Sequence, residues 1–134
     1  MALILSHLII QLYIQTQSMK LAIVGYRNYV DYAAFSLTVD SIILALGKPD
    51  EIISGGCTGA DRMAERYAKE HGITMTVLKP DERIKNNSRF AIRDKEIAKQ
   101  CTHMIAFPSK LGKGTQLTIG FAEKQKRTVF VYWI

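Results

Sequence analysis

Three loops in the sequence combine glycines with cationic or hydroxyl side chains, the residue types that bind phosphate. They span residues 25–28, 54–61 and 108–115. Glycine lets the backbone turn sharply and lets a ligand approach the main chain closely. A helix that begins after such a loop offers unpaired N–H groups and the positive end of its dipole. The three loops therefore predict anion binding, with phosphate as the natural ligand.

The second loop carries the strongest of these signals. Its candidate phosphate-binding residues follow a short β-branched run and are Ser54, Gly55, Gly56, Thr58 and Gly59. Thr58 and Asp61 have the spacing of a capping box, which predicts a helix start. Asp61 is expected either to accept from a ribose hydroxyl or only to cap the helix. The loop is not a P-loop, and Lys79 stands where an NAD site would carry an acid about 20 residues on.

The first and third loops add charge. Gly25 and Arg27 follow an apolar run, and an arginine there can hold a phosphate through two parallel hydrogen bonds or form a surface ion pair. Gly114 and Thr115 precede a helical pattern, with Lys113 beside them. This loop is either a second anion site or an ordinary flexible turn. A tight turn is also the alternative for the second loop.

The elements that position these loops alternate regularly. Strands are expected at residues 20–25, 51–54, 73–78, 102–107 and 128–132, and helices at 32–46, 60–71, 89–100 and 116–126. This alternation predicts an α/β fold: one doubly wound, Rossmann-like domain with a mainly parallel sheet of about five strands and helices on both faces. The expected core contains Ile23, Val24, Ile53, Val77, Ile105 and Val129. All three loops then lie at the carboxyl edge of the sheet, where open α/β sheets bind ligands.

Composition narrows the classes of function. The chain has 134 residues, enough for one domain, and a net charge of +6. No basic patch interleaved with aromatic residues is evident, so nucleic acid is expected to be an unlikely partner. The three histidines lack metal-ligand spacing, and we expect no metal and no cofactor. Two cysteines give no disulfide framework and favour a reducing, cytoplasmic location.

Residues 1–18 differ from the rest of the chain. They are rich in Leu and Ile, lack the pattern of a signal peptide, and are too short to span a bilayer, so no membrane partner is expected. Met19 directly precedes the first strand. Residues 1–18 are thus either a non-native extension before a start at Met19, or a helix or strand that covers an apolar patch and supports a homo-oligomer. Residues 19–134 form the expected ligand-binding domain.

Four motifs in order resemble the YspA-type (cpYpsA-related) branch of the SLOG superfamily. They lie at residues 24–29, 54–62, 92–96 and 114–115. The resemblance implies a Rossmann-like fold, a distant relation to the LOG phosphoribohydrolases, and a ligand derived from a nucleotide or from NAD. It also makes Arg93, which matches the SLOG arginine, a ligand residue. Arg89 lies one helical turn earlier and is either a ligand residue or solvated.

The sequence departs from the LOG pattern at its catalytic position. Where LOG enzymes carry a glutamate, this chain has Thr118, and Asp94 replaces the lysine that follows the arginine. LOG-type hydrolysis is therefore doubtful, and no catalytic residue is assigned. The loop at residues 79–88 also differs from the YspA pattern and is expected to cover the ligand.

Two functions from different classes remain. The first is binding of a phosphorylated, nucleotide-derived ligand, such as ADP-ribose, an NAD derivative or a nucleoside monophosphate, by a sensor, carrier or sequestering protein. The alternative is a hydrolase of an N-glycosidic or phosphate bond, with Asp61, Asp81, Glu82 or Glu123 as its base. Tyr26 and Tyr29 are candidates for base stacking or for simple packing, and Cys57 is expected to fill the loop.

Overall fold

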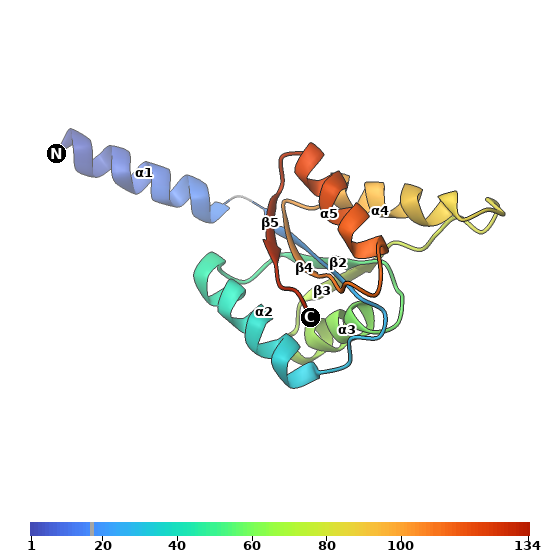
Figure 1. The fold of residues 1–134 in the computed structure, drawn as a ribbon. Helices are drawn as coiled ribbons and strands as arrows, with labels where there is room; N and C mark the ends of the chain where they lie inside the picture. The colour runs from blue at the N-terminus through green and yellow to red at the C-terminus, as the bar shows by residue number, and fades with distance from the viewer. Residues whose placement is uncertain (17) are drawn as a thin grey trace.

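The computed structural model describes residues 1–16 and 18–134 and contains a five-stranded parallel sheet (Figure 1). Its strands lie in the order β3-β2-β1-β4-β5. Their bounds are β1 Lys20–Gly25, β2 Glu51–Ser54, β3 Thr74–Val77, β4 His103–Phe107 and β5 Thr128–Val131. The predicted α/β, Rossmann-like fold is confirmed. The strand order reverses between β1 and β4, which makes their carboxyl ends the natural position for a ligand.

Four helices cover the two faces of the sheet. They are α2 Tyr32–Leu46, α3 Ala60–His71, α4 Ser88–Gln100 and α5 Gly114–Lys124. Helices α2 and α3 pack on one face, and α4 and α5 pack on the other (Figure 1). Helix α5 begins two residues earlier than expected, so Gly114 and Thr115 are its first residues rather than part of a loop.

The core follows the two-residue period of the strands. Leu21 and Ile23 of β1 face α2 and α3, whereas Ala22 and Val24 face α4 and α5. Because a central parallel strand is covered on both faces, four consecutive residues of β1 are buried. Of the six expected core residues, Val77 and Val129 are only partly buried, because they lie on the edge strands β3 and β5.

The helix ends are partly as expected. Asp31 accepts from the backbone N–H of Ala34 and caps α2, and Gly72 ends α3 in the left-handed conformation. The predicted capping box is wrong. Thr58 Oγ1 donates to the carbonyl of Arg27, while Asp61 accepts from the N–H of Cys57. The Thr58 side chain thus connects the loop before α3 to the loop after β1, and the Asp61 side chain connects the same loop to the first turn of α3.

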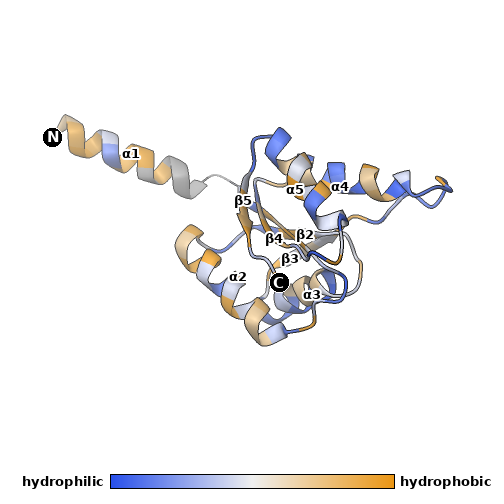
Figure 2. Ribbon diagram, in the orientation of Figure 1, coloured by the Kyte–Doolittle hydropathy of each residue, from blue (hydrophilic) through white to orange (hydrophobic). Residues whose placement is uncertain are grey.

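Helix α1, Ala2–Thr16, projects away from the domain (Figure 1) and is apolar along most of its length (Figure 2). Its large apolar side chains are exposed, including Leu3, Ile4, Ile9 and Leu12. Within the described parts of the chain, no helix combines the length and the apolar character needed to cross a membrane.

Candidate functional site

A cavity of about 450 Å³ opens at the carboxyl end of β1, between α4 and α5. Its floor is formed by Val24 and Gly25, at the point where the strand order reverses. Gly25 is required by packing, since a Cβ there would lie 2.6 Å from the Cβ of Ala60 and 2.9 Å from that of Phe107. The missing side chain lets helix α3 and strand β4 approach the end of β1.

Arg93 is the most heavily bonded side chain of the cavity. It is only 8% exposed, and its guanidinium donates to the carbonyl of Gly55 at 2.5 Å and to the carboxylate of Asp94 at 2.6 Å. It also contacts the sulfur of Cys57 at 3.6 Å. Arg93 is thus buried and paired with its neighbour Asp94, although it still lines the cavity. Arg93 joins α4 to the loop between β2 and α3.

This arrangement explains the glycines of the second loop. A Cβ on Gly55 would lie 2.6 Å from a guanidinium nitrogen of Arg93. Gly59 has φ +73°, and a Cβ there would lie 2.4 Å from the backbone of Arg27. Gly56, also at φ +73°, faces Val77. Each glycine thus permits a contact within the protein, and the loop is less open to a ligand than its sequence predicted.

Asp61 is a buried acid that lines the same cavity. The side chain is 6% exposed, and burial raises its pKa to about 6, although the N–H of Cys57 and the charge of Arg93 oppose the shift. Asp94 lies nearby and raises that pKa further. The structure therefore brings two carboxylates into one cavity, a pairing that the sequence analysis did not anticipate.

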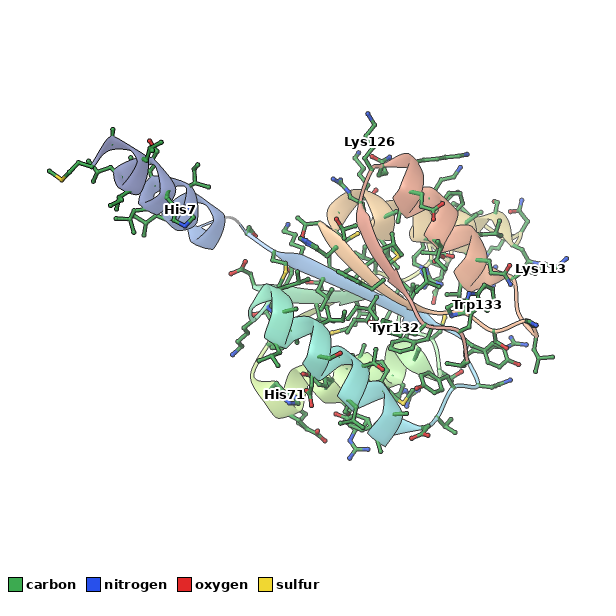
Figure 3. All side chains as sticks on the ribbon, turned by 60° about the vertical axis from the view of Figure 1, so that its left-hand side comes forward. His7, His71, Lys113, Lys126, Tyr132 and Trp133 are labelled. Atoms are coloured by element: carbon green, nitrogen blue, oxygen red, sulfur yellow. The ribbon has the colours of Figure 1, made fainter. Side chains whose placement is uncertain are left out.

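The cavity is also lined by cations that come from the loops after β1 and before α5. They are Arg27 and Lys113, and among the described residues neither has an ion-pair partner. Gly114 and Thr115 begin α5, whose start has no side-chain cap within the described chain. Figure 3 shows Lys113 near one end of α5, opposite Lys126. An anion at these residues would meet two cations and the free N–H groups of a helix start.

The eleven residues that the sequence proposed for the site divide into two groups. Seven line the cavity: Gly25, Arg27, Gly55, Asp61, Arg93, Gly114 and Thr115. Four do not line it: Ser54, Gly56, Thr58 and Gly59. Ser54 is fully buried under the loop, and Thr58 is bonded to the carbonyl of Arg27. For the seven residues that line the cavity, contact with a ligand stays a prediction. The four residues that do not line it contribute to the shape of the loop between β2 and α3.

Several cavity residues were missed by the sequence analysis. Phe90 and Ile97 of α4, together with Leu111, supply apolar surface. The spacing of Phe90 and Ile97 along α4 is equally typical of side chains in the hydrophobic core, and Leu111 lies in a loop, so the sequence did not identify these residues as part of a site. Thr118 lines the cavity and donates to the carbonyl of Gly114, so its hydroxyl is held within α5. Tyr26 also lines the cavity, whereas Tyr29 packs against Phe107 with ring centroids 5.3 Å apart.

The loop at residues 79–88, which was expected to cover the ligand, lines an adjoining hollow and not the cavity itself. Glu82 and Lys85 line a second hollow of about 480 Å³, which shares Gly55, Cys57, Phe90 and Arg93 with the cavity. Asp81 and Arg83 pair with each other at 2.9 Å. Across residues 1–16 and 18–134, no group of three or more His, Cys, Asp or Glu side chains is placed to hold a metal ion.

Comparison with known families places these features in context. Residues 19–83 match the model of the YspA, cpYpsA-related SLOG family. This stretch contains the first two glycine loops and ends in the loop before α4. No curated protein sequence matches the chain.

Two solved structures share the fold. DNA processing protein A from Streptococcus pneumoniae aligns with a TM-score of 0.69 and 21% identity over 85% of this chain. DNA processing protein A from Helicobacter pylori aligns with a TM-score of 0.67 and 17% identity over 89% of this chain. The chain spans half the length of the first protein and 67% of the second.

These neighbours correct one expectation. The structure of the Helicobacter pylori protein is described as showing a single-stranded DNA binding mode. A protein that contains this fold therefore binds single-stranded DNA. The expectation that nucleic acid is an unlikely partner is wrong. The match over residues 19–83, the glycine loops and the five-stranded fold agree with one another. The resemblance to the YspA, cpYpsA-related SLOG family is therefore confirmed over residues 19–83 of this chain.

Proposed function

We propose that the chain binds a phosphorylated, nucleotide-derived ligand in the cavity between α4 and α5. The candidates are ADP-ribose, an NAD derivative and a nucleoside monophosphate. The observation that carries the proposal is that one cavity is lined both by the cations Arg27 and Lys113 and by the carboxylates of Asp61 and Asp94. A nucleotide carries matching groups: an anionic phosphate and a sugar whose hydroxyls donate hydrogen bonds.

Each part of such a ligand has a suitable partner. Arg27, Lys113 and the start of α5 suit the phosphate, because charge-assisted hydrogen bonds to phosphate are strong. Asp94 accepts only one bond from Arg93 and keeps acceptor capacity for a ribose hydroxyl. Phe90 and Leu111 are exposed and apolar, which suits the face of a base. The volume of about 450 Å³ lies in the usual range for a small-molecule site.

Calorimetric titration with AMP, NAD and ADP-ribose tests the proposal. The purified protein is first examined by native mass spectrometry, since a retained ligand would identify the class directly. Arg27→Ala and Lys113→Ala should each weaken binding by about ten- to a hundredfold, the loss of one charge-assisted contact. Lys99→Ala removes the same charge from the far end of α4 and should bind like the wild type. Binding that survives both cavity substitutions would contradict the proposal.

A hydrolase of the ligand's N-glycosidic bond is the second candidate. It is favoured by the two carboxylates in the cavity and by the pKa of Asp61 near 6, which suits a general acid. In such a reaction the bond between the anomeric carbon and the base would break, and the base would leave with the proton of Asp61. Water would add to the anomeric carbon and lose a proton to Asp94, from which the proton would return to Asp61 through solvent. If the protein only binds, incubation with AMP should release no adenine. Release that disappears in Asp61→Asn would establish the hydrolase.

The similarity to the DNA processing proteins adds a third form of the ligand. A nucleotide within a single strand offers the same phosphate, sugar and base as a free nucleotide. The two forms differ only in what extends beyond the cavity, so the surface around its mouth distinguishes them.

A further inference from the structure

A basic hollow lies directly beside the cavity and shares one wall with it. The second hollow, of about 480 Å³, is lined by Lys79, Lys85 and Arg89, with Glu82 as its only lining acid. Among the described residues none of these three cations forms an ion pair. A ligand with one phosphate group would bind to the cations of the cavity, and Lys79, Lys85 and Arg89 would then have no phosphate to contact.

Phe90 stands between the two hollows and lines both. It is 38% exposed, and the guanidinium of Arg89 lies 4.6 Å from its ring centroid. An exposed aromatic ring flanked by cations is the arrangement on which unpaired bases stack. The ring of a base in a duplex is covered by its neighbours and would not reach it.

The basic surface continues beyond the second hollow. A third hollow, of about 710 Å³, shares Gly56 and Lys79 with the second and is lined by Arg62 and Lys69 of α3. The three hollows are thus contiguous: the first two lie at the carboxyl edge of the sheet, and the third, which Glu65 also lines, runs from that edge along α3. A small ligand such as ADP-ribose or NAD would occupy at most part of this run, whereas a strand with a phosphate at every nucleotide would use more of it.

We infer that an unpaired DNA strand binds along this edge, with one nucleotide in the cavity, the next base on Phe90, and the following phosphates at Arg89, Lys85 and Lys79. The inference rests on the proposed function, because the strand uses the nucleotide site of the cavity. The inference assigns recognition of the DNA strand to Arg89 and Phe90 of α4 and to Lys79 and Lys85 of the loop before α4. The binding should be independent of sequence, since stacking and phosphate contacts read no base edges.

Fluorescence anisotropy of a labelled oligothymidylate of about 20 nucleotides tests the inference. Phe90→Ala should weaken binding by about five- to a hundredfold, the loss of one stacking contact, and Phe90→Trp should restore it. Lys79→Ala with Lys85→Ala should weaken binding and lower the slope of log K against log salt by about 1.4, or 0.7 for each lost phosphate contact. Thermal melts check that each variant is folded.

A charge-matched control separates specific contacts from net charge. Lys48 and Lys99 are exposed and lie at the opposite edge of the sheet, before β2 and β4. Lys48→Ala with Lys99→Ala removes the same charge and should leave the affinity and the salt slope near those of the wild type. Equal losses in both double variants would overturn the inference, and so would wild-type affinity in Phe90→Ala or equal affinity for a duplex.

The remaining outcomes separate this inference from the proposed function. A protein that binds AMP or ADP-ribose but no strand overturns the inference and leaves the nucleotide site standing. A protein that binds neither overturns both. Tighter binding of an oligouridylate of the same length overturns the assignment to DNA. Competition between ADP-ribose and the strand supports the shared cavity, and simultaneous binding contradicts it.

Discussion

At the scale of single residues, Arg93 has a structural role beside the ligand role that the family motif implies. It lines the cavity, but its hydrogen bonds to Gly55 and Asp94 are contacts within the protein. An arginine fixed in this way holds the loop between β2 and α3 against α4. The cavity cations without an ion-pair partner among the described residues are Arg27 and Lys113, and these are the charges proposed to bind a phosphate.

Arg93→Ala should therefore destabilise the fold. The substitution leaves the carbonyl of Gly55 and the carboxylate of Asp94 without their donor, and we expect the free energy of unfolding to fall by about 1.5–3 kcal/mol. Urea denaturation measures it. Arg89→Ala, one helical turn earlier, removes two hydrogen bonds of 3.4 Å and a cation–π contact with Phe90, and should cost less. Equal stability of Arg93→Ala and the wild type would show that the guanidinium is not structural.

Asp61 should make stability depend on pH. Its pKa is about 6 in the folded protein and 3.8 in the unfolded chain, so folding favours the protonated form. The stabilisation is complete below about pH 4 and is lost as the pH rises through about 6, by up to about 3 kcal/mol. Asp61→Asn cannot ionise and should flatten this fall. Urea unfolding across that range checks it, and parallel curves for both proteins would contradict it.

At the scale of elements, most strands and helices could be predicted from the sequence. The β-branched run before Gly55 and the helix ends at Gly47 and Gly72 are local signals, and the structure places them as expected. The start of α5 was misplaced because Gly114 disfavours a helix by local propensity. The tertiary fold sets it there, and this changes two loop residues into the open end of a helix.

The candidate site was less predictable than the elements. The glycines at 55 and 59 signalled a ligand, but their neighbours are the guanidinium of Arg93 and the backbone of Arg27, which are distant in sequence. The convergence of Asp61 and Asp94 likewise depends on the packing of α3 and α4 against the same sheet edge. Contacts between residues that are distant in sequence produce no periodic pattern, so they cannot be predicted from a single sequence.

Helix α1 provides a prediction at the same scale. Removal of residues 1–18 should leave the thermal stability of the domain nearly unchanged, because the helix projects from the fold and its apolar side chains are exposed. Met19 remains to pair with Asp50. Thermal melts and light scattering measure stability and oligomeric state. A truncated protein that fails to fold would show that the segment belongs to the core.

At the scale of the whole molecule, the parallel sheet gathers every candidate group along one edge. The strand order reverses at β1 and β4, and the cavity, the basic hollow beside it and the start of α5 all lie at the resulting carboxyl edge. The core on both faces depends on none of these groups. Substitution of the exposed cations along the edge, such as Arg27 and Lys113, should therefore alter binding with little effect on the fold. Gly25, Gly55, Asp61 and Arg93 also have packing or hydrogen-bonding roles, so their substitution should affect the fold as well.

Gly114→Val tests the central claim, that the cavity binds a nucleotide-type phosphate at the start of α5. No described atom lies within 4 Å of a Cβ at Gly114 or at Gly120, so valine fits at either position. Only Gly114 lines the cavity, and Gly120→Val in the same helix is the control. The measurement is calorimetric titration of the wild type and both variants with ADP-ribose, NAD and AMP. We predict that the wild type and Gly120→Val bind at least one of them and that folded Gly114→Val binds it at least about tenfold more weakly. Equal binding by Gly114→Val, or no binding by the wild type, would contradict the account.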